Sequence, residues 1–135
     1  MKGEADCTPT EKDGVLCCYI RIALPDREFD RIWADFDTRS SADVVDVSYA
    51  ERLKKLGLSW GDNGGFFKVM GGGTVQAEGS MAVPVEITGR DARVPRRLRL
   101  DLSCEMMSAP AQIVLGYPTL KDSGLLKAAV QDFAG

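Results

Sequence analysis

The residues best suited to chemistry lie in the segment "WADFDTRSSADVV" (33–45), where an apolar run ends at a carboxylate. Asp37 is followed by Thr38, Arg39 and Ser40, and then by a second apolar run. An acid at the end of an otherwise buried strand is either a turn-forming residue or a catalytic aspartate. The sequence has no histidine, which excludes Ser-His and Cys-His nucleophilic catalysis, so catalysis must depend on carboxylates, Lys, Tyr, Cys or a bound cofactor.

Neither a metal ion nor a cofactor is expected from the cysteines and glycines of this chain. The commonest zinc ligand, histidine, is missing, and the four cysteines show no C-x-x-C spacing, which favours free thiols over a disulfide or a metal site. These cysteines are Cys7, Cys17, Cys18 and Cys104. No G-x-x-x-x-G-K-[ST] motif occurs, and no G-x-G-x-x-G lies between a strand and a long helix, so nucleotide binding is not indicated.

Two glycine clusters, "WGDNGG" (60–65) and "MGGG" (70–73), flank the short apolar segment "FFKV". Glycine relaxes backbone restrictions where a loop must move or approach a ligand closely. The second cluster therefore predicts the tip of a hairpin that contacts a ligand, with an ordinary glycine-rich turn, or a tip at 60–65, as alternatives. The cluster consists of Met70, Gly71, Gly72 and Gly73.

Length and composition indicate one globular domain. The 135 residues are enough for one core, 44% of them are hydrophobic, and charges of both signs are mixed along the chain. The net charge of −3 argues against a nucleic-acid partner, and the basic cluster "RVPRRLRL" alternates like one face of a strand. No apolar run approaches the roughly 18–20 residues that span a bilayer, and the polar N-terminus lacks a signal-peptide core, so we expect a cytoplasmic protein without a membrane partner.

The apolar patterning predicts a mostly β domain. Two alternating segments joined by the turn "PDRE" are expected to pair as a hairpin, and further short strands follow. Strand patterns occupy 15–24, 29–36, 42–47, two segments within 74–89, 95–106 and the continuously apolar 111–116. About seven strands with one or two short helices predict a closed barrel or a sandwich. The boundaries are a loose tail at 1–13, a domain at 14–127 and a C-terminal tail at 128–135.

Two segments have helix signals. "SYAERLKKLGL" (48–58) has Ser48 in position to cap the helix, Glu51 at the capping-box position and Gly57 as its stop. The side chains expected to face the core are Leu53 and Leu56. A second short helix is predicted near the start of "YPTLKDSGLLKAAVQDF" (117–133), where proline suits the first turn.

Four segments occur in an order that resembles the retropepsins, the aspartic proteases of retroviruses and LTR retrotransposons. Asp37, Thr38 and the small residues after Arg39 are similar to the D-T-G-[SA] active-site loop, and "ADVVDVSYAERLKKLGL" looks like the segment that follows it. "MGGGTVQAEGSMAVPVEITG" is similar to the flap hairpin of the family. "AQIVLGYPTLKDSG" looks like its I-[IL]-G-x-x-x-L segment, which packs beneath the active-site loop. The resemblance covers about residues 15–126 and implies an all-β acid-protease barrel with a flap.

This resemblance implies an aspartic endopeptidase that works as a homodimer. Aspartic proteolysis needs two carboxyl groups that share one proton and one water, and the chain has a single Asp-Thr loop. Two like charges so close cannot both form, so one group serves as the acid and the other as the base. Asp37 of each copy would meet its twin at the two-fold axis, where the Thr38 hydroxyls would hold the two loops together.

The same resemblance assigns supporting roles to other segments. The flap at 70–73 would close over an extended peptide, such as a segment of a polyprotein, and bond its backbone as an added strand. Leu115 and Gly116 would support the active-site loop from below, and Tyr117 would hydrogen-bond towards it. The tail at 128–135 would take part in the dimer interface.

Arg39 departs from the family pattern, which has glycine at this position. In a dimer, two guanidinium groups near the Asp37 pair would favour charged carboxylates over the shared proton, and they would also fill the central subsites. A working protease with an unusual cleft and a relic that has lost turnover both stay open. In a third alternative Arg39 swings outward and pairs with Asp35 or Asp43. A non-catalytic module that binds peptides or dimerises, and a generic β-barrel unrelated to proteases, are the other interpretations.

The remaining candidates have structural explanations. Asp43 and Asp46 flank a short strand and are expected to be solvated, while Asp35 fits an ordinary strand position. Trp33 and Trp60 are expected in the core or in hairpin packing.

Overall fold

The computed structural model describes residues 10–12, 15–26, 28–68, 72–87 and 98–125. Within these residues there are ten strands and two helices, against the seven or so strands expected. The strands are β1 (Thr10–Lys12), β2 (Val15–Ala23), β3 (Phe29–Asp37), β4 (Asp43–Asp46), β5 (Trp60–Gly61), β6 (Phe66–Lys68), β7 (Thr74–Gln76), β8 (Ser80–Ile87), β9 (Leu98–Met107) and β10 (Ile113–Gly116). The helices are α1 (Val47–Lys55) and α2 (Tyr117–Ser123).

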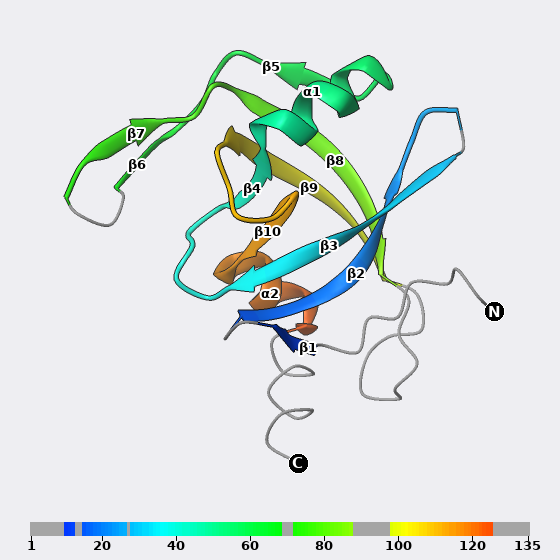
Figure 1. Ribbon diagram of the computed structural model, residues 1–135, viewed down its shortest axis with the longest axis horizontal. Coiled ribbons are helices and arrows are strands. Elements are labelled where there is room, and N and C mark those ends of the chain that lie inside the picture. Colours follow the sequence, from blue (N-terminus) through cyan, green and yellow to red (C-terminus); the bar gives the residue numbers. More distant parts are fainter. Residues whose placement is uncertain (1–9, 13–14, 27, 69–71, 88–97, 126–135) are drawn as a thin grey trace.

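Six of the strands close into a barrel (Figure 1). The order β2-β3-β10-β4-β9-β8 returns to its start because β8 pairs with β2 as well as with β9. The strands β1 and β5 lengthen the sheet beside β2 and β8. The prediction of a mostly β closed barrel with one or two short helices is therefore confirmed, and the sandwich alternative is wrong.

The long β2–β3 hairpin forms where the alternating pattern predicted it. Eight residue pairs join the two strands, from Leu16↔Phe36 to Ala23↔Phe29. Alternation then determines which side chains enter the core, because successive residues of a strand point to opposite faces. Ile32, Ala34 and Phe36 are buried, whereas the residues between them are more exposed.

Helix α1 covers one side of the barrel and begins two residues before the predicted position. Asp46, not Ser48, caps the helix, and its carboxylate accepts a hydrogen bond from the Ser48 backbone N–H. Glu51 is therefore not at the capping-box position. The helix stops as predicted before Gly57, whose φ of 100° is accessible to glycine at little cost. Leu53 is fully buried, as expected.

The predicted tails are described only in part. Residues 10–12, which were expected to belong to a loose tail, form β1 against β2. The C-terminal tail at 128–135 lies outside the described residues, and α2 ends at Ser123. In the described part of the chain no helix is long and apolar enough to cross a membrane.

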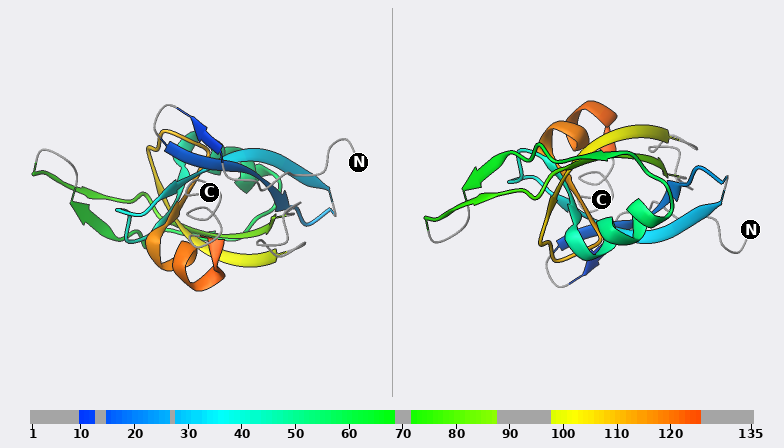
Figure 2. Two further views of the ribbon diagram at one scale, coloured as in Figure 1. Left: turned by 90° about the horizontal axis from the view of Figure 1, so that it is seen from below. Right: turned by 90° about the horizontal axis from the view of Figure 1, so that it is seen from above.

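A separate two-stranded hairpin, β6–β7, extends away from the barrel in all three views (Figures 1 and 2). Its three residue pairs run from Phe66↔Gln76 to Lys68↔Thr74. An isolated pair of strands is marginally stable in water, so the position of this hairpin depends on the contacts that hold its base to the barrel.

Candidate functional site

Asp37 is the last residue of β3 and lies at the surface. Because Phe36 points into the core, the strand directs Asp37 the other way. The Asp37 Oδ1 accepts a hydrogen bond of 2.9 Å from the backbone N–H of Arg39, and the Asp37 carbonyl accepts one of 3.1 Å from Ser40 N. The turn thus orients one carboxylate oxygen, while Oδ2 has no hydrogen-bond partner among the described residues.

The loop after Asp37 rests on β10. This strand runs between β3 and β4, parallel to the first and antiparallel to the second, although it comes about 70 residues later in the sequence. All four of its residues are buried, and Leu115 pairs with Phe36. Gly116 pairs with Asp37, and the next backbone N–H, that of Tyr117, donates to Ser40 O at 2.9 Å.

Gly116 allows this close contact because it has no side chain. A Cβ at this position would lie 2.5 Å from the carbonyl oxygen of Ala42 and 2.9 Å from that of Ser40. Both distances are shorter than a real Cβ contact, so the loop and β10 approach each other at a distance that only glycine permits. The glycine packs against the backbone of the loop at Ser40 and Ala42.

Asp43 is buried, and the prediction that it is solvated is wrong. Its exposed fraction is 8%; Oδ1 accepts from the Gly116 N–H at 2.8 Å, and Oδ2 accepts from the Thr119 hydroxyl at 2.6 Å. The carboxylate therefore ties the far end of the loop to β10 and α2. Asp46 is also engaged, because its Oδ1 accepts from the Ala109 N–H in addition to capping α1.

The other residues of the predicted active-site loop differ in their surroundings. Thr38 and Arg39 are exposed, and Ser40 is half-buried with its hydroxyl donating to Ala42 O at 2.6 Å. Arg39 makes no ion pair with any residue that the structure describes, so the alternative in which it pairs with Asp35 or Asp43 is not seen.

The β6–β7 hairpin answers the question of which glycine cluster forms a tip. Its strands are connected by residues 69–73, whereas the 60–65 cluster contains β5 and lies at the base of the hairpin. Met70 and Gly71 lie outside the described residues. Gly72 has a φ of 90°, a conformation that favours glycine, and Gly73 is exposed.

Glu105 anchors the base of this hairpin to the barrel. Its Oε1 accepts a hydrogen bond of 2.5 Å from the Gly65 N–H, and the Gly65 carbonyl accepts one of 2.8 Å from Ala77 N. The carboxylate on β9 thus holds the residue at which β6 leaves the barrel. Nothing in the spacing around Glu105 distinguished it from an ordinary strand residue.

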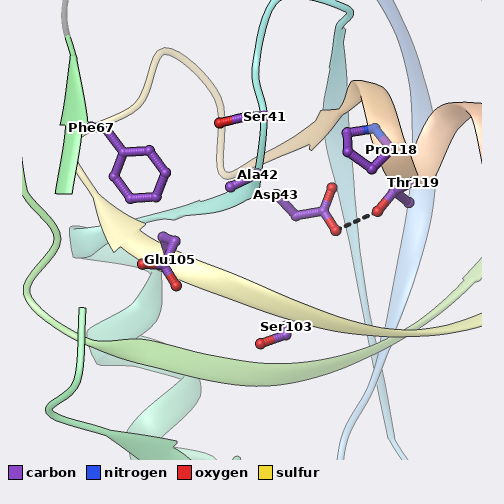
Figure 3. Close-up of a pocket in the computed structure, with 8 residues that line it drawn as sticks. All are labelled: Ser41, Ala42, Asp43, Phe67, Ser103, Glu105, Pro118 and Thr119. Carbon is purple, nitrogen blue, oxygen red and sulfur yellow. Dashed lines mark hydrogen bonds between the residues drawn. The ribbon is translucent and has the colours of Figure 1, made fainter. Parts of the chain in front are cut away.

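A hollow of about 360 Å³ lies between the loop, the hairpin and α2 (Figure 3). Figure 3 shows the Asp43 carboxylate bonded to Thr119 on one side of the hollow and the Phe67 ring on the other. The lining residues are Ser41, Ala42, Asp43, Phe67, Ser103, Glu105, Pro118 and Thr119. Asp37 is not among the lining residues, so this hollow is not built around the predicted catalytic residue.

Cysteine chemistry is not supported at Cys104. This thiol is free and fully buried next to Asp43, and burial raises its pKa, with the Asp43 and Glu105 carboxylates adding to the shift. A buried thiol of raised pKa is a poor nucleophile. Among the residues that the structure describes, no three His, Cys, Asp or Glu side chains are grouped to hold a metal ion.

Comparison with known proteins adds no relative. No protein-family model matches the chain, and no curated protein matches its sequence. The site itself presents one exposed carboxylate with one oriented oxygen. A single such group cannot serve as acid and base in the same step.

Proposed function

We propose that this chain is a retropepsin-type aspartic endopeptidase whose active form is a homodimer. The observation that carries the proposal is the exposed Asp37 carboxylate at the end of β3, oriented by the Arg39 N–H in a loop that β10 supports through Gly116. A two-fold axis beside this loop would bring two Asp37 carboxyl groups together from two copies of the chain. The pair supplies the acid and the base that one chain lacks.

In this mechanism the two Asp37 side chains hold one proton and one water. The charged carboxylate takes a proton from the water as its oxygen attacks the peptide carbonyl carbon, and the protonated carboxyl group gives its proton to the carbonyl oxygen. Proton transfer to the amide nitrogen then allows the C–N bond to break. The β6–β7 hairpin serves as the flap, which covers an extended substrate and excludes water. The proposed substrate is a polyprotein segment.

A second function is a peptide-binding or dimerisation module without turnover. Arg39 favours it, because the residue whose backbone N–H orients the Asp37 carboxylate also carries an exposed cationic side chain. In the dimer the guanidinium groups would stabilise two charged carboxylates and oppose the shared proton. This candidate keeps the same fold and the same β6–β7 hairpin and differs only in catalysis.

The test is cleavage of a peptide library at pH 4–6 by the native chain and its variants. We expect Asp37→Asn to lower cleavage at least roughly a hundredfold, because the residue supplies both proton-transfer roles. Asp26→Asn is the matched control, since Asp26 is also exposed and its Oδ1 also accepts from the backbone N–H two residues later. Cleavage that survives Asp37→Asn would refute the proposal.

Arg39→Gly separates the two candidates. We expect it to raise cleavage by about tenfold or more if the guanidinium groups oppose the shared proton. A variant that dimerises and binds peptides but cleaves none of them would establish the non-catalytic module instead.

A further inference from the structure

The outer face of the β2–β3 hairpin carries a group of arginines and aromatic rings that the proposed function does not use. It consists of Tyr19, Arg21, Phe29, Arg31 and Trp33, and we call it the Arg–aromatic face. These residues alternate with the buried Ile20, Ile22 and Ile32, so they point away from the core. Arg31 and Phe29 are exposed and the other three are half-buried.

Cross-strand register places the two arginines directly opposite each other. Arg21 pairs with Arg31, between the Tyr19↔Trp33 pair on one side and the Ala23↔Phe29 pair on the other. Each guanidinium turns away from its counterpart and lies over a ring of the neighbouring pair. The Arg31 guanidinium carbon is 3.8 Å from the Tyr19 ring centroid, and that of Arg21 is 3.8 Å from the Phe29 ring centroid.

Among the residues that the structure describes, the two cations have no acidic partner. Like charges directly opposite each other destabilise a strand pair, yet neither arginine forms an ion pair with the residues that the structure describes. The nearest acid by register is Glu86, which pairs with Arg21 across the barrel seam but makes no ion pair with it. A guanidinium held over a ring is already ordered and still offers N–H donors to a carboxylate.

We propose that the Arg–aromatic face docks an acidic peptide segment in extended conformation. Alternate side chains of an extended strand lie about 7 Å apart on the same side. Two acidic residues at such positions can therefore each reach one guanidinium group, one over the Tyr19 ring and the other over the Phe29 ring. The rings supply the apolar contact between these ion pairs. The occupant is a peptide because a chain of net charge −3, with two unpaired cations on this face, cannot neutralise the many phosphates of a nucleic acid.

The test is fluorescence anisotropy at pH 7.5 with the full chain and a labelled twelve-residue peptide of alternating Glu and Thr. Replacing both arginines, R21Q/R31Q, is expected to weaken binding by about tenfold or more, because both charge-assisted contacts are lost. The matched control K55Q/K121Q removes two other exposed cations, on α1 and α2, and changes the net charge equally, so we expect less than about a twofold effect. Glu86→Gln is expected to tighten binding severalfold, since it removes a carboxylate that competes for Arg21.

Equal affinities of R21Q/R31Q and K55Q/K121Q would overturn the proposal. Tight binding of a labelled oligothymidylate without binding of the Glu-Thr peptide would also overturn it, in favour of a nucleic-acid surface. Binding of the corresponding Gln-Thr peptide at the same affinity would show that charge has no part. Because none of these variants touches Asp37, the outcome is independent of proteolytic activity.

Discussion

Asp30, the second residue of β3, links the barrel to α1 through its carboxylate. Its Oδ2 accepts from the Tyr49 hydroxyl at 2.8 Å and from Arg52 Nε at 3.1 Å. The Arg52 hydrogen bond lowers the pKa of Asp30 against the opposing effect of burial, and the Tyr49 bond lowers it further. Burial, together with Asp30, raises the pKa of Tyr49, so this hydroxyl stays protonated as a donor.

Asp30→Asn is expected to lower the free energy of unfolding by about 1 kcal/mol at neutral pH. The effect is this small because Arg52 is largely exposed and solvent screens its ion pair with Asp30. The folded pKa lies below the unfolded value of about 3.9, so the stabilisation is present above that pH and is lost as the pH falls through the folded pKa. Urea unfolding at pH 7 and pH 3 checks this: the difference between native and variant should shrink at pH 3. Asp101→Asn, at the exposed Arg99 ion pair, should change little at either pH, and an Asp30 effect of undiminished size at pH 3 would contradict the assignment.

Single residues of the site differ in how far sequence could place them. The alternation of buried and exposed residues along β3 is enough to place Asp37 on the outside of the barrel, because local pattern determines the face of a strand residue. Asp43 could not be placed in this way. Its partners Gly116 and Thr119 lie 73 and 76 residues later, and no local signal reports a contact at that distance.

At the scale of elements, the contact between β10 and the loop that follows Asp37 can be tested through Gly116. Gly116→Ala should destabilise the protein by roughly 2 kcal/mol, because the new Cβ would overlap backbone oxygens that cannot rotate away. Its φ of −83° is open to alanine, so the effect is steric. Gly61→Ala is the control, since nothing lies within 4 Å of its Cβ position. Equal melting temperatures for the two variants would contradict the close contact.

The anchorage of the β6–β7 hairpin depends on the Glu105 carboxylate. Glu105→Ala removes the acceptor of the Gly65 N–H, so the hairpin amides should exchange with solvent about tenfold faster. This corresponds to a decrease of about 1.4 kcal/mol in the free energy of local opening. Glu105→Gln keeps a carbonyl acceptor and should have a smaller effect. Ser103→Ala, two residues away on the same strand, controls for a change in the surface. Hydrogen exchange of residues 65–68 and 74–77 measures the difference, and unchanged rates in Glu105→Ala would exclude this anchor.

Sequence patterns predicted the elements better than their ends. The hairpin of β2 and β3, the buried β10 and the helix at Pro118 all follow from alternation, continuous apolarity or proline placement. The start of α1 was missed because Asp46 and Ser48 are both good caps. Asp46 becomes the cap because its second carboxylate oxygen also accepts a hydrogen bond from the Ala109 N–H. Ala109 lies 63 residues later in the chain, so the local sequence does not indicate this contact.

At the scale of the whole molecule, the proposed dimer predicts that inactive chains suppress the activity of intact chains when the two are mixed. In solution the protein should sediment with twice the chain mass of 14.7 kDa. A tenfold excess of Asp37→Asn chains added to native or Arg39→Gly chains, whichever cleave, should suppress cleavage by about tenfold, since most active chains would then pair with inactive ones. The same excess of Asp26→Asn chains should not suppress it. Cleavage unaffected by added Asp37→Asn chains would mean that one chain acts alone.

The place of β10 in the barrel has a consequence for how the protein is made. This strand leaves the ribosome after every other strand described, yet it is inserted between two that were synthesised some 70 residues earlier. Until it arrives, β3 and β4 have no common neighbour, and the Asp37 turn has nothing beneath it. A nascent chain therefore cannot complete the support beneath the Asp37 turn before β10 has left the ribosome.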